Sequence, residues 1–282
     1  MDILILQPHG YCPGVKRALE LAQKALKEEE GPLLMIGGLV HNERVLAELK
    51  KDGIIFPTSE PLDTILGADK NDRLLFSAHG HPLAYEELAA LRGLRYYDGT
   101  CPFVQENLEA ALSFEGAILY LGIAGHDEAV AFQCNVPDCS FYDVKTGEWN
   151  PIKLKGQELP VGIICQTTLG NDEIETALKA IREYLPDVTV LKENCPSSKA
   201  RQKVIENLKD VDALIIMGSP TSANSKQLVR IGESKGIESH LCLDVEAVKA
   251  LDLSGKKKIA LGSGASVPEA TLQEALSYLR SL

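Results

Sequence analysis

Several features that would assign this chain to other protein classes are missing from its sequence. No apolar run reaches the roughly 18–20 residues that a membrane-spanning helix needs. The apolar start, residues 1–6, is too short for a signal peptide and lacks its basic flank. Positive charge is in deficit, since 29 Lys and Arg face 40 Asp and Glu, for a net charge of −11. We therefore expect a cytoplasmic protein with no nucleic-acid and no membrane partner.

Closely paired cysteines and long linkers are also lacking. The seven cysteines show neither the dense spacing of a disulfide scaffold nor the paired short spacings of structural zinc sites. No Ser-rich or Pro-rich linker divides the 282 residues, and 45% of them are hydrophobic, which is ample for a core. The sequence therefore predicts one compact domain over residues 1–282 rather than separate modules.

The chain does contain a unit that occurs three times. Each copy has a short apolar run, a polar turn, a Cys-Pro pair and then an amphipathic helix. The pairs are Cys12-Pro13, Cys101-Pro102 and Cys195-Pro196, so that the cysteines are 89 and 94 residues apart. The approximate repeats cover residues 1–92, 93–186 and 187–282.

Two further polar turns recur in every copy, each after a predicted strand. The first lies 25 to 29 residues after the cysteine and the second 66 to 71 residues after it. Strands that alternate with helices predict a parallel sheet, and ligands of such sheets collect at the carboxyl ends of the strands. We therefore predict an α/β fold with three pseudo-equivalent lobes, each a small, mostly parallel sheet with flanking helices. The lobes are expected to form a trefoil around a central cluster.

The repeated cysteines favour a metal site. A cysteine at the start of a helix meets the positive end of the helix dipole, which favours the thiolate. Three buried, inert cysteines are the alternative interpretation. Structural zinc and electron-carrying 4Fe-4S clusters usually take four protein ligands. Three cysteines on a 4Fe-4S cluster would leave one iron open to act as a Lewis acid, as in a catalyst. The candidate ligands are Cys12, Cys101 and Cys195.

The remaining turns carry hydrogen-bonding side chains with little fixed charge. They are His41, His79, His126, Thr167, Ser222, Asn224 and Ser266. Donors that converge from several strand ends suit a phosphate or diphosphate, although any single Ser or Thr can instead cap a helix. Glu128 lies beside one of these turns, where it could deliver a proton to a metal-bound oxygen. A solvated surface glutamate is the alternative there.

Taken together, these motifs resemble the 4-hydroxy-3-methylbut-2-enyl diphosphate reductase family, the LytB-type iron–sulfur reductases. The resemblance covers the whole chain, and its motifs are specific as an ordered set. The clearest are Gly10-Tyr11-Cys12-Pro13, Val40-His41-Asn42, Ser77-Ala78-His79-Gly80, Thr100-Cys101-Pro102, Gly125-His126-Asp127-Glu128, Gln166-Thr167-Thr168 and Gly264-Ala265-Ser266.

The resemblance implies a site and a reaction. It implies a trefoil around one 4Fe-4S cluster held by Cys12, Cys101 and Cys195. The diphosphate would be bound by His41, His79, His126, Ser222, Asn224 and Ser266, and the catalytic set would be Glu128, Thr167 and His126. The implied reaction is reductive dehydroxylation of (E)-4-hydroxy-3-methylbut-2-enyl diphosphate to isopentenyl and dimethylallyl diphosphates, the last step of the non-mevalonate isoprenoid pathway. Ferredoxin or flavodoxin would supply the electrons.

The sequence departs from the usual pattern of the family at three places. His9 replaces an Arg, Ala223 replaces the middle Ser of a Ser-Ser-Asn turn, and Ser197-Ser198 replace Ala-Thr. Two alternatives therefore stay open. One is a paralogous open-site 4Fe-4S dehydratase or reductase that acts on another phosphorylated substrate. The other is a non-enzymatic sensor that carries the cluster.

Overall fold

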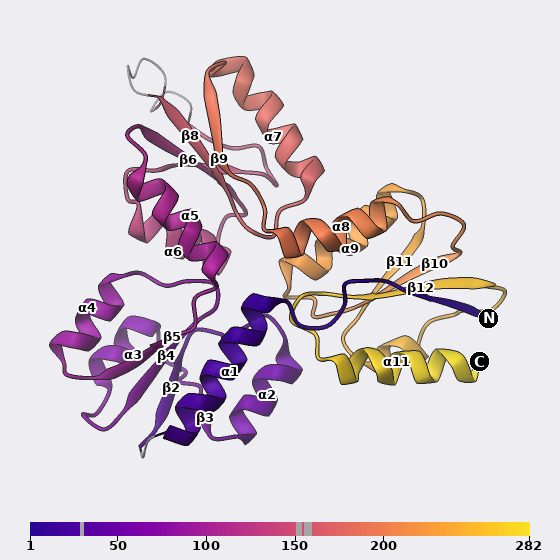
Figure 1. Cartoon of the computed structure of the whole chain (residues 1–282), viewed down its shortest axis with the longest axis horizontal. Coiled ribbons are helices and arrows are strands. Elements are labelled where there is room, and N and C mark those ends of the chain that lie inside the picture. The colour runs from indigo at the N-terminus through magenta and orange to yellow at the C-terminus, as the bar shows by residue number, and fades with distance from the viewer. Residues whose placement is uncertain (29–30, 151–153, 155–159) are drawn as a thin grey trace. The chain divides into compact units, whose positions relative to one another are not determined.

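Three parallel four-stranded sheets form the framework of the chain. The computed structural model describes residues 1–28, 31–150, 154 and 160–282 (Figure 1). Every strand pairing within the three sheets is parallel. The prediction of an α/β fold built on three small parallel sheets is confirmed.

The first sheet has the strand order β3-β2-β4-β5. Its strands are β2 (Leu33–Ile36), β3 (Ile54–Ile55), β4 (Arg73–Phe76) and β5 (Arg95–Asp98). The helices of this part of the chain are α1 (Pro13–Glu28), α2 (Glu43–Lys51), α3 (Pro61–Gly67) and α4 (Ala84–Leu91). Strand β4, which pairs with β2 and β5, is buried along its whole length.

The second sheet has the order β7-β6-β8-β9. Its strands are β6 (Ala117–Gly122), β7 (Ser140–Asp143), β8 (Val161–Cys165) and β9 (Val188–Lys192). The helices around it are α5 (Pro102–Ser113), α6 (Asp127–Asn135) and α7 (Asn171–Tyr184). The neighbouring strands β6 and β8 end at the same edge of this sheet, which places the turns that follow them close together.

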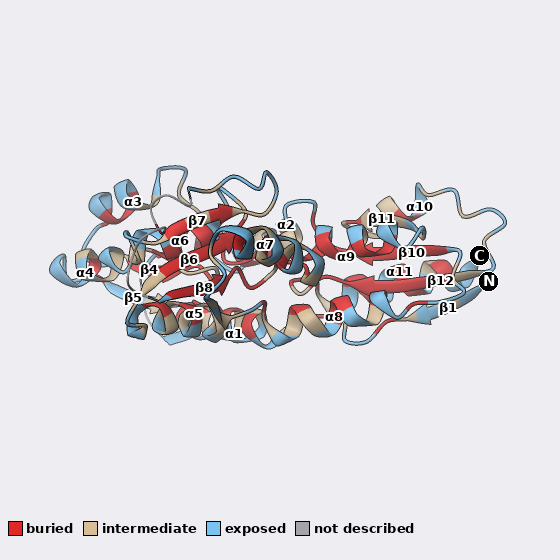
Figure 2. Cartoon of the chain, turned by 90° about the horizontal axis from the view of Figure 1, so that it is seen from above, coloured by how far each residue is buried: buried red, intermediate tan, exposed pale blue. Residues whose placement is uncertain are grey.

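The third sheet has the order β1-β12-β10-β11. Its strands are β1 (Asp2–Ile5), β10 (Ala213–Met217), β11 (Glu238–Cys242) and β12 (Lys258–Ser263). The helices are α8 (Pro196–Glu206), α9 (Ala223–Ser234), α10 (Val245–Lys249) and α11 (Glu269–Ser281). The central strands of the sheets are largely buried (Figure 2).

The three sheets share one topology, and it is offset from the sequence repeats. Counted from the strand that precedes each Cys-Pro pair, the orders are β5-β4-β2-β3, β9-β8-β6-β7 and β1-β12-β10-β11. The opening strand of each repeat therefore pairs in the sheet of the preceding repeat, and β1 pairs in the last sheet. This cyclic strand exchange supports the triplication that the cysteine spacing predicts.

Contacts divide the chain into two compact units. Unit 1 comprises residues 1–16, 40–48 and 196–282 and contains the third sheet, whereas unit 2 comprises residues 17–39 and 49–195 and contains the other two. Cores of fully buried aliphatic side chains lie inside both units, including Ile215 and Leu261 in unit 1 and Leu119 and Ile163 in unit 2. Among the described helices, none has the length and apolar character that crossing a membrane requires.

Candidate active site

The three repeated cysteines have the same backbone environment. The Cys12 amide donates to the carbonyl of Ala265 over 2.9 Å, and the Cys101 amide donates to that of Ala78 over 3.0 Å. The Cys195 amide donates to the carbonyl of Thr167 over 3.0 Å. In each case the acceptor belongs to the second polar turn of the preceding repeat, with the third repeat preceding the first. The structure thus gives the three thiols equivalent positions within the repeats.

Each of these thiols lies at the start of a helix. Helices α1, α5 and α8 begin at the proline that follows each cysteine. Cys101 is the N-cap of α5 and has an extended backbone (φ −62°, ψ 134°). The Val15 amide donates to Cys12 Sγ over 3.4 Å. Because helix N-termini favour negative groups, this environment suits thiolate ligands, and proline at the first helical position loses no hydrogen bond.

The loop before Cys12 is held on both sides within unit 1. The Gly10 amide donates to Ser263 Oγ over 2.9 Å, and the Gly10 carbonyl accepts from Arg201 Nη2 over 2.8 Å. Gly10 has a φ of +71°, a conformation that favours glycine. His9, where the family usually has Arg, lies 2.7 Å from Glu269 through Nδ1 and Oε2. The histidine at this position therefore has a hydrogen-bond partner, Glu269, in the structure.

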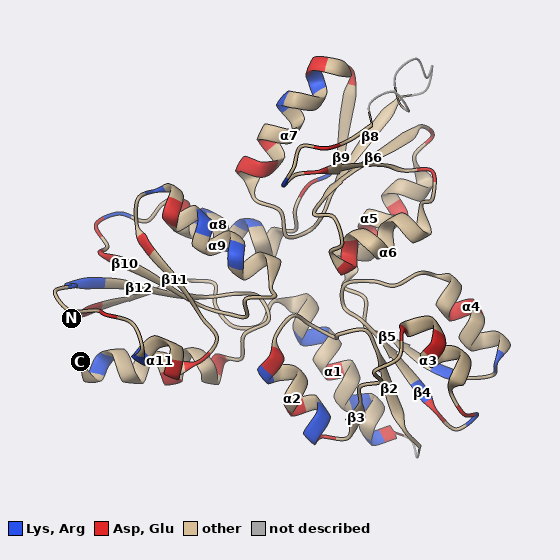
Figure 3. Cartoon of the chain, turned by 180° about the vertical axis from the view of Figure 1, so that it is seen from behind, with Lys and Arg blue, Asp and Glu red and all other residues tan. Residues whose placement is uncertain are grey.

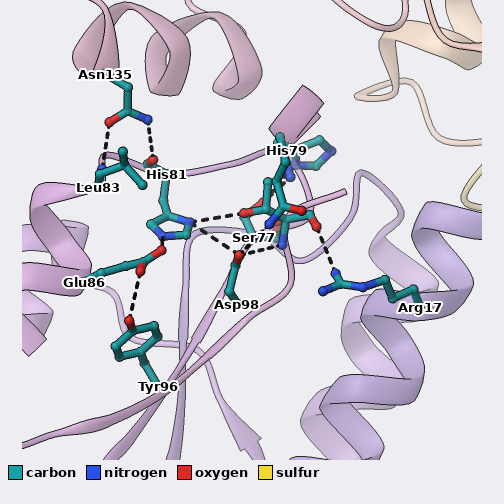
Figure 4. A network of polar contacts seen from close by, with 12 residues as sticks. Arg17, Ser77, His79, His81, Leu83, Glu86, Tyr96, Asp98 and Asn135 are labelled. Carbon is teal, nitrogen blue, oxygen red and sulfur yellow. Dashed lines mark hydrogen bonds and ion pairs between the residues drawn. The ribbon is translucent and has the colours of Figure 1, made fainter. Parts of the chain in front are cut away.

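The segment before Cys101 is held by a separate polar network in unit 2 (Figure 4). Buried His81, which the sequence gives no role, bonds Glu86 between Nε2 and Oε1 over 2.9 Å. Asp98 accepts the Thr100 amide over 2.8 Å, and Arg17 Nη1 donates to the Thr100 carbonyl over 2.9 Å. We interpret these contacts as support for the cysteine turn.

Unit 1 contains four of the predicted diphosphate-binding residues, namely His41, Ser222, Asn224 and Ser266. Ser222 Oγ caps α9 by accepting the Ser225 amide over 3.2 Å, and Ser266 Oγ donates to the His41 carbonyl over 3.1 Å. Asn224 is 4% exposed, and neither its Nδ2 nor its Oδ1 has a hydrogen-bond partner among the described residues. A buried amide with both ends unsatisfied is costly, so this side chain is suited to a polar ligand.

Unit 2 brings together two of the predicted histidines, His79 after β4 and His126 after β6. The rings of His79 and His126 lie 6.0 Å apart, edge to face. Ser77 Oγ lies 3.0 Å from His79 Nδ1, and both residues appear in Figure 4. His126 caps α6, and its Nδ1 accepts the Glu128 amide over 3.2 Å. The neutral His126 ring therefore carries its proton on Nε2, which makes that atom a hydrogen-bond donor.

Glu128 and Thr167 form the closest pair among the predicted site residues. Thr167 Oγ1 donates to Glu128 Oε2 over 2.6 Å, and the Thr167 amide donates to Oε1 over 2.8 Å. Glu128 is 3% exposed, so it is not the solvated surface glutamate of the alternative interpretation. Burial raises the pKa of Glu128 to about 7, against the opposing effect of the bonds from Thr167. A carboxyl group of this kind can give up a proton near neutral pH.

One residue in contact with this pair has no signal in the sequence. Tyr120, fully buried in β6, donates its hydroxyl to Glu128 Oε1 over 3.3 Å. An aromatic residue within an apolar strand indicates core packing, and nothing in the local pattern marks its hydroxyl.

Two of the remaining cysteines are buried. Cys165 and Cys242 each lie at the end of a strand, and their burial agrees with a structural role for both.

Comparison with known proteins extends over the whole chain. The family model described as LytB protein matches residues 3–280. The chain belongs to the LytB protein family. A 4-hydroxy-3-methylbut-2-enyl diphosphate reductase of Acidithiobacillus ferrooxidans is 35% identical over 293 residues, covering 99% of this chain and 89% of the relative. A protein of Burkholderia mallei named 4-hydroxy-3-methylbut-2-enyl diphosphate reductase 2 is 32% identical, covering 100% of this chain and 86% of the relative.

Two solved structures in this family match the fold. The E-1-hydroxy-2-methyl-but-2-enyl-4-diphosphate reductase from Plasmodium falciparum aligns with a TM-score of 0.84 and 26% identity, covering 99% of this chain and 87% of that one. An (E)-4-hydroxy-3-methyl-but-2-enyl diphosphate reductase, described as the terminal enzyme of the non-mevalonate pathway, aligns with a TM-score of 0.68 and 26% identity over both full chains. LytB family membership supports a metal-cluster cofactor, and thiols at helix starts are suitable ligands for one.

Proposed function

We propose that this chain is a 4-hydroxy-3-methylbut-2-enyl diphosphate reductase, which converts its substrate to isopentenyl and dimethylallyl diphosphates in the last step of the non-mevalonate isoprenoid pathway. The carbon–oxygen bond of the substrate breaks, two electrons and two protons are consumed, and the hydroxyl group leaves as water. Its full-length relatives carry this name. The observation that carries the proposal is the buried pair of Glu128 and Thr167, which combines a proton donor with a hydroxyl side chain.

We propose that the cofactor is one 4Fe-4S cluster held by Cys12, Cys101 and Cys195. Such a cluster supplies one-electron redox chemistry and, with three protein ligands, one open coordination position. Two observations support this ligand set. The backbone amides of the three cysteines donate equivalent hydrogen bonds, and the Val15 amide donates to Cys12 Sγ. The proposal also treats residues 1–282 as one three-lobed domain, which the shared topology of the three sheets supports.

The diphosphate would be bound by the polar side chains of the turns after the strands. Asn224 has an amide with two unsatisfied ends, which can donate to one phosphate oxygen and accept from a hydroxyl or water beside it. Ser222 Oγ already accepts a backbone amide, so its own hydrogen stays available for a phosphate oxygen. Ser266 donates to the His41 carbonyl, and this bond orients the His41 turn. His79 and His126 would add ring N–H donors.

The proton for the leaving hydroxyl would come from Glu128. Its carboxyl group is mostly protonated below about pH 7, because burial disfavours the charged form and raises its pKa to about 7. After the proton is delivered, two hydrogen bonds from Thr167 stabilise the remaining carboxylate. Thr167 would also orient the substrate hydroxyl beside Glu128. General acid catalysis of this type typically contributes about 10²–10⁴ in rate.

The electrons would come from a small carrier protein, ferredoxin or flavodoxin, in the cytoplasm. Such carriers are acidic, whereas this chain has a net charge of −11, so docking needs a local basic surface. Helices α8 and α9 carry Lys and Arg residues within unit 1, and we propose that these form such a surface (Figure 3). The exposed residues Lys203 on α8 and Lys226 on α9 belong to it. Docking at this surface should weaken as salt is raised.

The proposed reaction is tested by product formation in anaerobically reconstituted protein. The protein is incubated with (E)-4-hydroxy-3-methylbut-2-enyl diphosphate, with and without a one-electron reductant, and the two product diphosphates are separated and quantified. We expect both products only when the reductant is present. Loss of water from the substrate without reductant, to give a product two electrons more oxidised than these two diphosphates, would instead establish an open-site dehydratase. An unconsumed substrate that leaves the spectrum of the cluster unchanged would favour a sensor.

A further inference from the structure

Tyr120 occupies a tightly defined position behind the candidate proton donor. Its ring stacks on Phe132 of α6, with ring centroids 4.2 Å apart and planes at 27°. Phe141 of β7 flanks it at 6.2 Å. A Cβ at position 122 would lie 2.8 Å from Tyr120 Cε1, so Gly122 leaves the space that the ring needs. Helix α6, strand β7 and Gly122 of β6 itself therefore define the space that the ring occupies.

The hydroxyl of this ring reaches the Glu128 carboxyl group from the interior. Tyr120 Oη donates to Oε1 over 3.3 Å, and the same oxygen accepts the Thr167 amide over 2.8 Å. With the bond from Thr167 Oγ1 to Oε2, the carboxyl group has three donors. Donors of this kind stabilise the ionised carboxylate, whereas burial favours the protonated acid. The hydroxyl of Tyr120 therefore opposes the effect of burial.

We propose that Tyr120 is a positioning residue that orients the Glu128 carboxyl group and stabilises the carboxylate left when its proton has been given up. This inference rests on the proton role assigned to Glu128 above. It adds to the site a residue of a strand, Tyr120 of β6, whereas the site residues predicted from the sequence lie in the polar turns. It also gives a reason for a buried hydroxyl in the middle of an otherwise apolar strand.

The groups around Tyr120 and Glu128 are few. His126 and Asp127 adjoin Glu128 on α6, and His126 Nδ1 accepts the Glu128 amide rather than bonding its carboxyl group. Cys165 of β8 and Cys139 before β7 lie close enough to act electrostatically on the Tyr120 hydroxyl. Burial and the charge of Glu128 hold the pKa of Tyr120 well above its ordinary value of 10. Tyr120 therefore remains a donor throughout the titration of Glu128.

The test is the titration of Glu128 in the full-length protein, followed by infrared spectroscopy of its protonated carboxyl band. The band is assigned by its loss in Glu128→Gln, and the protein is measured with and without reconstituted cluster. In Tyr120→Phe, which removes one donor, we expect the midpoint to rise by roughly one pH unit. The matched control is Tyr142→Phe, at another buried tyrosine on neighbouring β7, which should leave the midpoint unchanged. The alkaline limb of kcat/KM should move with the midpoint.

An unchanged midpoint in Tyr120→Phe, or an equal rise in Tyr142→Phe, would overturn the proposal. A second variant covers the case in which Tyr120→Phe fails to fold. Site-specific 3-fluorotyrosine at position 120 is a more acidic phenol and hence a stronger donor, so the midpoint should fall. A shift of the infrared midpoint without a shift of the alkaline limb supports the action of Tyr120 on Glu128. That result would refute the proton role of Glu128 in the reaction.

Discussion

Thr167 contacts Glu128 twice, through its hydroxyl at 2.6 Å and its amide at 2.8 Å, although 39 residues separate them in the chain. The contact arises because β6 and β8 are parallel neighbours, so the turns after them meet at one edge of the sheet. It places a hydroxyl and a backbone donor on a buried carboxyl group. Four predictions follow from this pair and from the surrounding site.

Replacing Glu128 by Gln should lower kcat by about 10²–10⁴-fold with little change in KM. The amide keeps the size of the side chain and can still accept from Thr167, but it cannot give up a proton. Steady-state kinetics of reconstituted protein with the hydroxylated diphosphate would measure the effect. Glu246→Gln, at an acidic residue in the first turn of α10, is the matched control and should be silent. Near-normal turnover in Glu128→Gln would refute the proton role.

The pH dependence of kcat/KM should show the titration of Glu128. Burial raises the pKa of this carboxyl group to about 7, and a general acid acts in its protonated form. Activity should therefore be high below about pH 7 and fall about tenfold per pH unit above it. The alkaline limb should be absent from the residual activity of Glu128→Gln. A limb that persists there would assign the titration to another group.

The stability of the apoprotein should depend on the same group. Because the pKa of Glu128 is higher in the folded than in the unfolded protein, its favourable contribution is complete below about pH 4.5 and is lost as the pH rises to about 7. The loss amounts to roughly 3 kcal/mol of the free energy of unfolding. Urea unfolding at several pH values would show that the free energy of unfolding declines between these two pH limits. The Glu128→Gln variant should lack this decline. Parallel pH profiles of the two proteins would contradict this account.

Replacing Asn224 by Ala should raise KM by roughly 10- to 100-fold, the effect of one hydrogen bond to a charged group. Thr167→Ala should raise KM less and lower kcat more, since Thr167 contacts Glu128. The apoprotein loses no hydrogen bond in Asn224→Ala, because neither end of this amide has a partner among the described residues. Thermal unfolding of the apoprotein should therefore change little. Equal KM values in the two variants would argue against a diphosphate role for Asn224.

The sequence predicts the twelve strands that the structure describes and the order of the polar turns, because apolar runs and turn residues are local signals. It misses the helices α3, α6, α9 and α10. Helix α6 begins within the run Gly125-His126-Asp127-Glu128, which indicates a turn, and its small apolar residues give little helical periodicity. In α9, polar residues such as Asn224, Ser225 and Gln227 are buried, which hides the apolar face.

Pairing and side-chain contacts between distant residues are beyond the reach of local patterns. The repeats are visible as spacing, but the exchange of β1, β5 and β9 into the preceding sheets depends on strand pairing. The contact between Tyr120 and Glu128 likewise depends on how α6 packs on β6. The roles of the predicted ligands and substrate-binding residues remain predictions. Family resemblance supplies those roles, whereas the structure supplies local geometry.

The central claim is that three cysteines hold a 4Fe-4S cluster whose remaining iron takes the substrate. Mössbauer spectra of anaerobically reconstituted protein, recorded with and without the hydroxylated diphosphate, test it most directly. The account predicts that the signal of one iron among the four changes when the substrate is added, and that Cys12→Ser, Cys101→Ser and Cys195→Ser each prevent assembly of the cluster. Colourless protein after reconstitution would contradict this claim. Four iron signals that stay unchanged when the substrate is added would also contradict it.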